Sequence, residues 1–194
     1  LIPAPMIFGS LALTIVMTVK GWKHIDFTDI KILQLSLLLG IVLGASVISY
    51  LPLSKMGALF GILILVAVFA SMLTSTTQHN IKWYPFIGAL SGFMGTVSAV
   101  GAPILAILFQ YKSGPSLRAT LAFLYCVSSV AILICLFFVG KFGVAELESG
   151  MYMIPGFLLG YFIAPLFIPW VDRGNSRPIV LILSSVSALI LIFR

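Results

Sequence analysis

The sequence predicts an all-α membrane protein with about seven transmembrane or re-entrant segments. Of its 194 residues, 61% are hydrophobic and only 8% are charged, and a water-soluble domain with this balance would expose large apolar patches. The charged residues divide the chain into uncharged tracts, most of which hold the roughly 20 apolar residues that a helix needs to cross a bilayer. One tract is rich in glycine and contains a proline, which predicts a broken helix.

The helices before this glycine-rich tract are predicted from the apolar runs of the sequence and the polar or proline-containing breaks between them. A first helix is expected over residues 5–19, followed by the polar connection GWKHIDFTDIK. A second helix ends near Tyr50, because Pro52 disfavours helix at the residue before it and has no N–H to donate. A third helix reaches about Leu73, where the polar run TSTTQHNIKWY begins.

Three helices are expected after the glycine-rich tract. The first covers residues 115–139, with Pro115 in its first turn, where a missing N–H costs nothing. The second covers residues 151–170. The third begins near Pro178 and reaches the end of the sequence.

The glycine-rich tract, residues 85–111, differs from the others. Its helix breakers are Gly88, Gly92, Gly95, Gly101 and Pro103. Glycine costs about 1 kcal/mol per helix position relative to alanine, and an interior proline costs about 3 kcal/mol. We therefore expect two half-helices, near residues 85–95 and 103–111. Each would be only about 14–16 Å long at 1.5 Å per residue, too short to cross the bilayer alone.

The basic residues indicate how this tract lies in the membrane, because short cytoplasmic loops carry an excess of Lys and Arg. If the tract crosses, the eleven basic residues divide six to five between the two sides. If it turns back as a re-entrant hairpin, they divide eight to three. We therefore expect the hairpin, with Glu146 and Glu148 on the outer side.

A weak internal repeat agrees with this arrangement. Two helices carry a pair of glycines followed by a proline: Gly40, Gly44 and Pro52, then Gly156, Gly160 and Pro169. Residues 1–73 would form a first repeat and residues 74–194 a second, with the broken hairpin over 85–111 and three helices. The two would be inverted, as in many secondary transporters. The hairpin of the first repeat is missing, so we expect an N-terminally incomplete chain.

The ionisable residues exclude several functions. Every carboxylate and histidine falls in a predicted loop: Asp26, Asp29, Glu146, Glu148, Asp172, His24 and His79. The apolar tracts therefore lack a proton relay, a metal-ligand set and a general base. We expect no enzyme activity, catalytic residue, metal site or cofactor. Cys126 and Cys135 lie nine positions apart in one helix and are expected to be buried hydrophobes rather than a disulfide.

Neutral polar groups gather at the break in the tract. A half-helix beginning near Ala102 would direct unpaired N–H groups and about half a positive charge at a small anion. The expected substrate-binding residues there are Thr96, Ser98, Ala99, Gly101, Ala102 and Pro103. Further candidates on neighbouring helices are Thr120, Ser128, Ser129, Ser10 and Thr14, although such hydroxyls often bond their own backbone.

Helix packing is the alternative interpretation for several of these residues. Small residues four positions apart more often mark close helix contact than a ligand site, and we favour packing for Gly88, Gly92 and the two repeated glycine pairs. Arg118 would either attract anions at the entrance of a transport path or anchor its helix on the cytoplasmic side, where basic residues are in excess.

Three stretches resemble the TauE/SafE family of sulfite and organosulfonate exporters: GALSGFMGTVSAVGAPILAIL, RATLAFLYCVSS and IPGFLLGYFIAPLF. The resemblance covers nearly the whole chain. Where family members usually show a run of glycines before the proline, this chain has Ser98, Ala99, Val100, Gly101 and Ala102. The resemblance implies secondary transport of sulfite or a related small anion across the inner membrane.

The leading hypothesis is therefore a permease for a small anion, either sulfite or a related sulfur oxyanion or organosulfonate. The alternative is a non-transporting membrane scaffold or anchor subunit that uses its glycine-lined helix faces for association. We expect a multi-pass protein of the cell inner or plasma membrane. Its expected partners are the anion and the lipid bilayer, with no nucleic acid, and a homodimer is left open.

Overall fold

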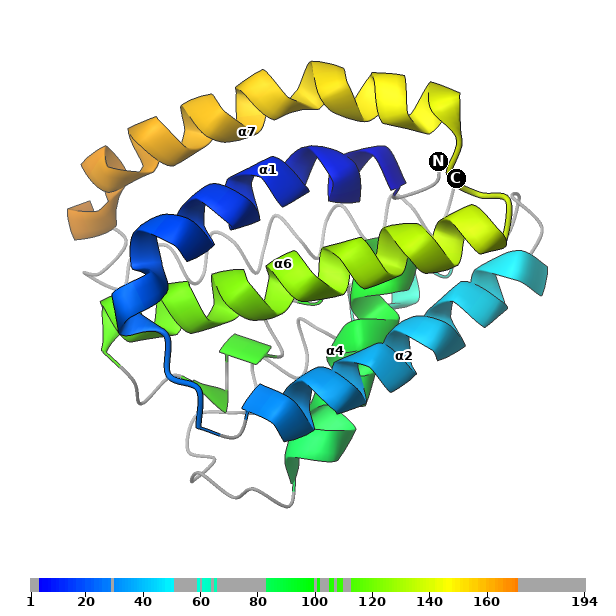
Figure 1. Cartoon of the computed structure of the whole chain (residues 1–194), viewed down its shortest axis with the longest axis horizontal. Helices are drawn as coiled ribbons and strands as arrows, with labels where there is room; N and C mark the ends of the chain where they lie inside the picture. Colours follow the sequence, from blue (N-terminus) through cyan, green and yellow to red (C-terminus); the bar gives the residue numbers. More distant parts are fainter. Residues whose placement is uncertain are drawn as a thin grey trace.

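A computed structural model describes residues 4–28, 30–50, 59, 61–63, 65, 83–99, 101, 105–106, 108–109 and 113–170. The elements in chain order are α1 (Ala4–Gly21), η1 (Trp22–His24), α2 (Ile30–Tyr50), α4 (Tyr84–Ser98), α6 (Gly114–Phe138) and α7 (Val144–Trp170) (Figure 1). This part of the chain contains no strand. The helix predicted from Pro178 to the end lies outside the described residues, as does most of the helix predicted to end near Leu73.

Four of the described helices are long and apolar enough to cross a membrane: Ala4–His24, Ile30–Tyr50, Gly114–Phe138 and Val144–Leu166. This confirms the predicted all-α membrane fold, while the count of seven segments stays a prediction. Helix α4 has only 15 residues, or about 22 Å at 1.5 Å per residue, which is shorter than the roughly 30 Å hydrocarbon core.

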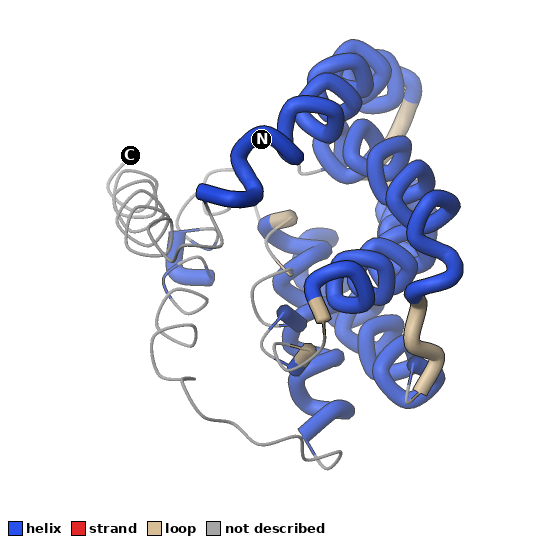
Figure 2. Tube along the Cα trace, turned by 90° about the vertical axis from the view of Figure 1, so that its left-hand side faces the viewer, coloured by secondary structure: helices blue, strands red, loops and turns tan. Residues whose placement is uncertain are grey.

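The directions of the long helices follow from contacts near their ends. A Cβ at Gly21, the last residue of α1, would lie 2.8 Å from Cβ of Ala119 in the first turns of α6. At the other end, the rings of Phe8 and Phe142 lie 6.0 Å apart. Helices α1 and α6 are therefore antiparallel, and Figure 2, turned by 90°, views the bundle along several of its helices.

Helix α7 runs in the same direction as α1. Near their beginnings, a Cβ at Gly150 would lie 2.9 Å from the carbonyl oxygen of Pro5. Further along, the Lys20 Nζ lies 5.0 Å from the ring centre of Tyr161. The prediction placed Gly156 and Gly160 in close helix contact, but the described residues supply no atom within 4 Å of a Cβ at either glycine.

Helix α4 packs against α2, and the two run parallel. Gly88 lies against Ser36, Gly92 against the backbone of Leu37, and Gly44 against Thr96. The closest approach is at Gly40, where a Cβ would collide with the backbone of Ala89. The predicted packing role of Gly40, Gly44, Gly88 and Gly92 is therefore confirmed. This contact also explains why α4 continues to Ser98 despite its glycines, beyond the predicted end near residue 95.

The glycine-rich tract enters and leaves the bundle at the same end, as the predicted re-entrant hairpin does. Helix α4 begins beside the first turns of α2, where Ser36 Oγ donates to the carbonyl of Tyr84 over 3.4 Å. The tract ends at Gly114, where α6 begins beside the end of α1. Helix α4 reaches the level of Gly44 of α2, which lies against Thr96.

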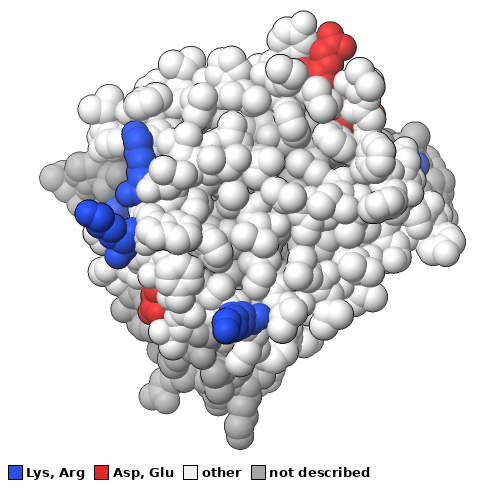
Figure 3. Space-filling view, in the orientation of Figure 1, with Lys and Arg blue, Asp and Glu red and all other residues white. Residues whose placement is uncertain are grey.

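Charged side chains mark the two ends of the bundle. The end of the bundle where α1 ends and α2 and α6 begin carries Lys20, Lys23, Lys31 and Arg118, together with Asp26. The opposite end carries Lys141, Glu146 and Glu148. Figure 3 shows basic side chains where α1 ends and acidic side chains where α7 begins. The described residues therefore have the asymmetry that the charge count predicted.

One predicted boundary is wrong. Glu146 and Glu148 were expected in a loop before a helix at residue 151, but α7 already begins at Val144. The cause is a cap: the Glu146 carboxylate accepts the N–H of Gly143 over 2.9 Å. A glutamate three residues into a helix commonly bonds the residue that caps it, and negative charge is favourable in a first turn.

Candidate functional site

The break in the glycine-rich tract begins directly after α4. Ala99 has φ 57° and ψ 15° and donates its N–H to the Gly95 carbonyl over 3.1 Å. This left-handed conformation is a common helix ending, but it costs a residue with a Cβ about 1–2 kcal/mol. The chain is helical again at Leu105. The break therefore lies inside the bundle, with helix on both sides of it.

Ser91 holds the break in shape. Its hydroxyl donates to the buried carbonyl of Gly101 over 2.8 Å, which joins the middle of α4 to the chain after the break. A Cβ at Gly101 would lie 2.6 Å from the Ser91 carbonyl oxygen and 3.3 Å from the Cα of Gly95. Only glycine fits at position 101 without moving α4. The sequence prediction included Gly101 but not Ser91.

Tyr125 approaches the same place from α6. Its buried hydroxyl lies within hydrogen-bonding reach of the Ser91 side chain, and it forms no well-aligned hydrogen bond with any described residue. An unpaired hydroxyl away from water costs roughly 2–7 kcal/mol, depending on the reference state. Groups left in this way are typical of sites that a ligand or water completes.

A second unpaired group lies on α2. Gln34 donates from Nε2 to Ser128 Oγ over 3.2 Å, and its Oε1 is buried without a partner among the described residues. Ser128 lies three residues after Tyr125 on α6, so both project from one face of that helix. Polar contacts therefore join α2 to α6 at Gln34 and Ser128, α6 to α4 at Tyr125 and Ser91, and α4 to the break at Gly101.

Thr96 and Ser98, the substrate-binding residues predicted on α4, donate their hydroxyl protons to carbonyls of the same helix. Thr96 is fully buried against Gly44 and donates to the carbonyl of Gly92 over 2.8 Å. Ser98 is half-buried and donates to the carbonyl of Met94 over 2.9 Å. Both hydroxyl oxygens keep lone pairs, but their protons are used. Ala102 and Pro103 lie outside the described residues.

The predicted residues of the neighbouring helices fall into two groups. On α6, Ser128 bonds Gln34, Ser129 is buried, and Thr120 accepts the N–H of Asp26 over 3.1 Å, which fixes the loop between α1 and α2. On α1, Ser10 and Thr14 bond the carbonyls of their own helix over 3.0 and 2.9 Å. Helix α1 packs on α6 and α7, so these two hydroxyls lie away from α4.

Sequence signals existed for the residues that the prediction missed. Gln34 is an amide within an otherwise apolar helix, and Tyr125 is a phenol in the middle of one. Both are costly in lipid unless they face protein or a cavity. Among the described residues, no group of three His, Cys, Asp or Glu side chains could hold a metal ion.

The family profile "Sulfite exporter TauE/SafE" matches residues 1–191. The chain belongs to the TauE/SafE family. It is therefore a membrane transporter and not an enzyme. This confirms the resemblance seen in the sequence. Comparisons with curated proteins and with solved structures gave no match.

Proposed function

We propose that this TauE/SafE chain transports a small sulfur oxyanion, sulfite or an organosulfonate, and binds it at the break in the glycine-rich tract. The observation that carries the proposal is the buried hydroxyl of Tyr125 beside Ser91 and Gly101, which forms no well-aligned hydrogen bond with a described residue. A phenol at this place supplies a buried proton donor next to Ser91, whose own proton is donated to Gly101. The oxygen atoms of a sulfite or sulfonate group are strong acceptors for such a donor.

The short helical turn that has resumed by Leu105 adds to this donor. The first N–H groups of a helical turn have no partner within it, so they are available to an anion. No Lys, Arg, Asp or Glu side chain lies near the break among the described residues. A site built from dipoles holds an anion without a full counter-charge, so it also releases the anion readily, as transport requires.

The basic end of the bundle indicates which end of the protein faces the cytoplasm. Lys20, Lys23, Lys31 and Arg118 lie at this end, and short loops rich in Lys and Arg face the cytoplasm. We propose the inner membrane as the location, with the mouth of the re-entrant hairpin on the cytoplasmic side. Positive potential at the mouth would raise the local concentration of an anion there.

Flux into proteoliposomes tests the proposal. A labelled organosulfonate is the better probe because the sulfonate stays ionised and does not cross lipid unaided. Tyr125→Phe removes only the unpaired donor, and Tyr152→Phe, at a tyrosine of α7 that is 78% exposed, is the matched control. A hydrogen bond to a charged group contributes about 1.5–3 kcal/mol, so Tyr125→Phe should lower transport efficiency roughly 10- to 150-fold.

Two results would count against the proposal. The first is equal flux with and without protein across sulfite, organosulfonates and other oxyanions, together with recovery of a stoichiometric protein partner, since that pair of results favours a scaffold subunit. The second is full activity in both Tyr125→Phe and Ser98→Leu, which would place the anion elsewhere in the bundle.

A further inference from the structure

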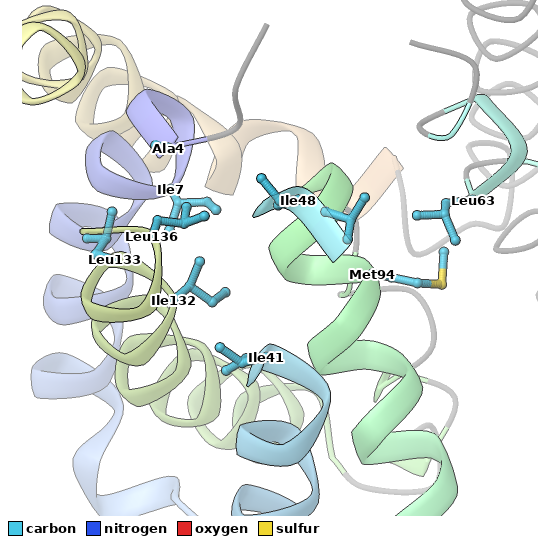
Figure 4. Packing of buried hydrophobic residues seen from close by; sticks show 10 residues of the cluster. Ala4, Ile7, Ile41, Ile48, Leu63, Met94, Ile132, Leu133 and Leu136 are labelled. Atoms are coloured by element: carbon cyan, nitrogen blue, oxygen red, sulfur yellow. The ribbon is translucent and has the colours of Figure 1, made fainter. Parts of the chain in front are cut away.

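The break at Gly101 lies between two apolar clusters. On one side, Ala99 packs against buried residues of α1, α2, α4 and α6, among them Ile41, Met94 and Leu136 (Figure 4). On the other side, Leu105, where the chain is helical again, is buried with Leu33, Leu37 and Leu124. The described residues of neither cluster include a charged side chain. An ion at the break therefore has apolar side chains on both sides, where charge is costly.

The basic side chains of α2 and α6 lie at the end of the bundle. Lys31 is exposed in the first turn of α2, and Arg118 is exposed near the start of α6, seven residues before Tyr125. Seven residues correspond to a rise of about 10 Å along a helix. The other titratable side chains on α2, α4 and α6 are phenols and thiols, which carry no positive charge in either protonation state: Tyr50, Tyr84, Tyr125, Cys126 and Cys135. Among the described residues, none therefore supplies a full counter-charge to an anion at the break.

The described residues leave one hydrogen-bond donor and one acceptor open beside the break. The donor is the hydroxyl of Tyr125, and the acceptor is Oε1 of Gln34, which is buried. The two side chains meet the same face of α6, because Gln34 donates to Ser128 and Ser128 is one turn from Tyr125. An occupant that satisfies both groups must accept one hydrogen bond and donate another.

These two properties of the site distinguish the two ionic forms in which sulfite exists near neutral pH. The sulfite dianion carries two negative charges and only hydrogen-bond acceptors, whereas hydrogen sulfite carries one negative charge and one proton. The cost of taking an ion out of water rises with the square of its charge, so it is about four times larger for the dianion. The dianion would also place an acceptor oxygen against the Gln34 carbonyl oxygen, while hydrogen sulfite can donate its proton to it.

We propose that the site binds only singly charged oxyanions and takes sulfite as hydrogen sulfite, with Oε1 of Gln34 accepting its proton. The proposal rests on the proposed function for the position of the site, and adds the charge state of the substrate and the residue that selects it. A proton then crosses the membrane on the substrate itself. The described helices need no carboxylate relay for this, and their apolar stretches contain none.

Equilibrium binding at two pH values tests the charge state. Binding of labelled sulfite to the purified chain in detergent is measured by scintillation proximity, one pH unit below and one above the second pKa of sulfurous acid. The hydrogen sulfite fraction falls about tenfold between these conditions, so the apparent Kd for total sulfite should rise about tenfold. Unlabelled methanesulfonate, singly charged at both pH values, should compete equally well at both. Sulfate, doubly charged at both, should compete at least about tenfold more weakly than methanesulfonate.

Gln34→Leu tests the acceptor. Loss of one hydrogen bond should weaken sulfite binding at the lower pH about 2- to 13-fold. Methanesulfonate has no proton to donate, so its binding should not weaken. Ser46→Ala is the matched control, at an exposed residue of α2 whose hydroxyl bonds the carbonyl of Val42 in its own helix, and it should change neither constant. A purely structural effect of Gln34→Leu would instead weaken both ligands equally.

Three outcomes would overturn the proposal and leave the proposed function standing. One is an apparent Kd for total sulfite that stays constant or falls as the pH rises. Another is sulfate competing as well as methanesulfonate. The third is an equal loss of sulfite and methanesulfonate binding in Gln34→Leu. If none of these anions binds to the chain at either pH, the proposed function fails as well, so the two failures can be told apart.

Discussion

Gly40 and its repeat equivalent Gly156 differ in how closely other atoms pack on them. Alanine substitution at each glycine tests this difference through the stability of the protein. At Gly40 a Cβ would collide with the carbonyl group of Ala89 and lie 2.8 Å from the backbone N of Phe93. Both obstacles are backbone atoms of α4, which cannot rotate away as a side chain can. Overpacking of this kind costs about 1–3 kcal/mol, so we expect Gly40→Ala to destabilise the protein by that amount.

The repeat equivalent supplies the control. A Cβ at Gly156 would have no described atom within 4 Å, and alanine is a better helix former than glycine by about 1 kcal/mol. In this chain Gly156→Ala should therefore be neutral or slightly stabilising. Thermal unfolding in detergent, followed by circular dichroism, measures both. At roughly 2–4 °C per kcal/mol for a chain of this size, Gly40→Ala should lower Tm by about 2–12 °C. Equal Tm shifts in the two variants would refute the described α2–α4 contact.

Three further substitutions have definite outcomes. Ser91→Ala leaves the Gly101 carbonyl without its donor; the cost of about 1–3 kcal/mol should appear as a lower Tm and reduced flux, whereas Ser149→Ala should change neither. Glu146→Ala removes the cap of α7, so amide exchange in the first turn of that helix should become faster while the rest of α7 is unchanged. Thr120→Val removes the acceptor that fixes the loop between α1 and α2, and should cost about 1 kcal/mol without altering substrate selectivity.

Apolar tract length and the glycine and proline positions were enough to predict the described helices α1, α2 and α6 and the break after α4. Membrane helices can be predicted in this way because the bilayer demands a long apolar run and full backbone hydrogen bonding within it. The re-entrant path was predicted from loop charges alone, and the structure places the start of α4 and the start of α6 at one end of the bundle. The start of α7 was missed, because the two glutamates suggested a loop when one of them caps a helix.

The candidate site was only partly predictable. Gly101 could be identified because a glycine two residues before a proline, in a tract with several other glycines, marks a break. The partner of that break could not, since the bond from Ser91 to Gly101 joins residues ten positions apart across a turn. Tyr125 and Gln34 belong to other helices, and their unpaired atoms appear only when the helices are assembled. Ser10 was predicted to bind substrate because it carries a hydroxyl. Whether that hydroxyl faces the site depends on how α1 packs, which the sequence does not give.

The account depends on the glycine-rich tract entering and leaving the membrane on one side. Single cysteines at Trp83→Cys, Ser113→Cys and Gly143→Cys, in a chain without its native cysteines, can be labelled with a membrane-impermeant maleimide in sealed right-side-out and inside-out vesicles. We predict that Trp83→Cys and Ser113→Cys react from the same side and that Gly143→Cys reacts from the opposite side. Labelling of Trp83→Cys and Ser113→Cys from opposite sides would show that the tract crosses the membrane, and would contradict the site described at its break.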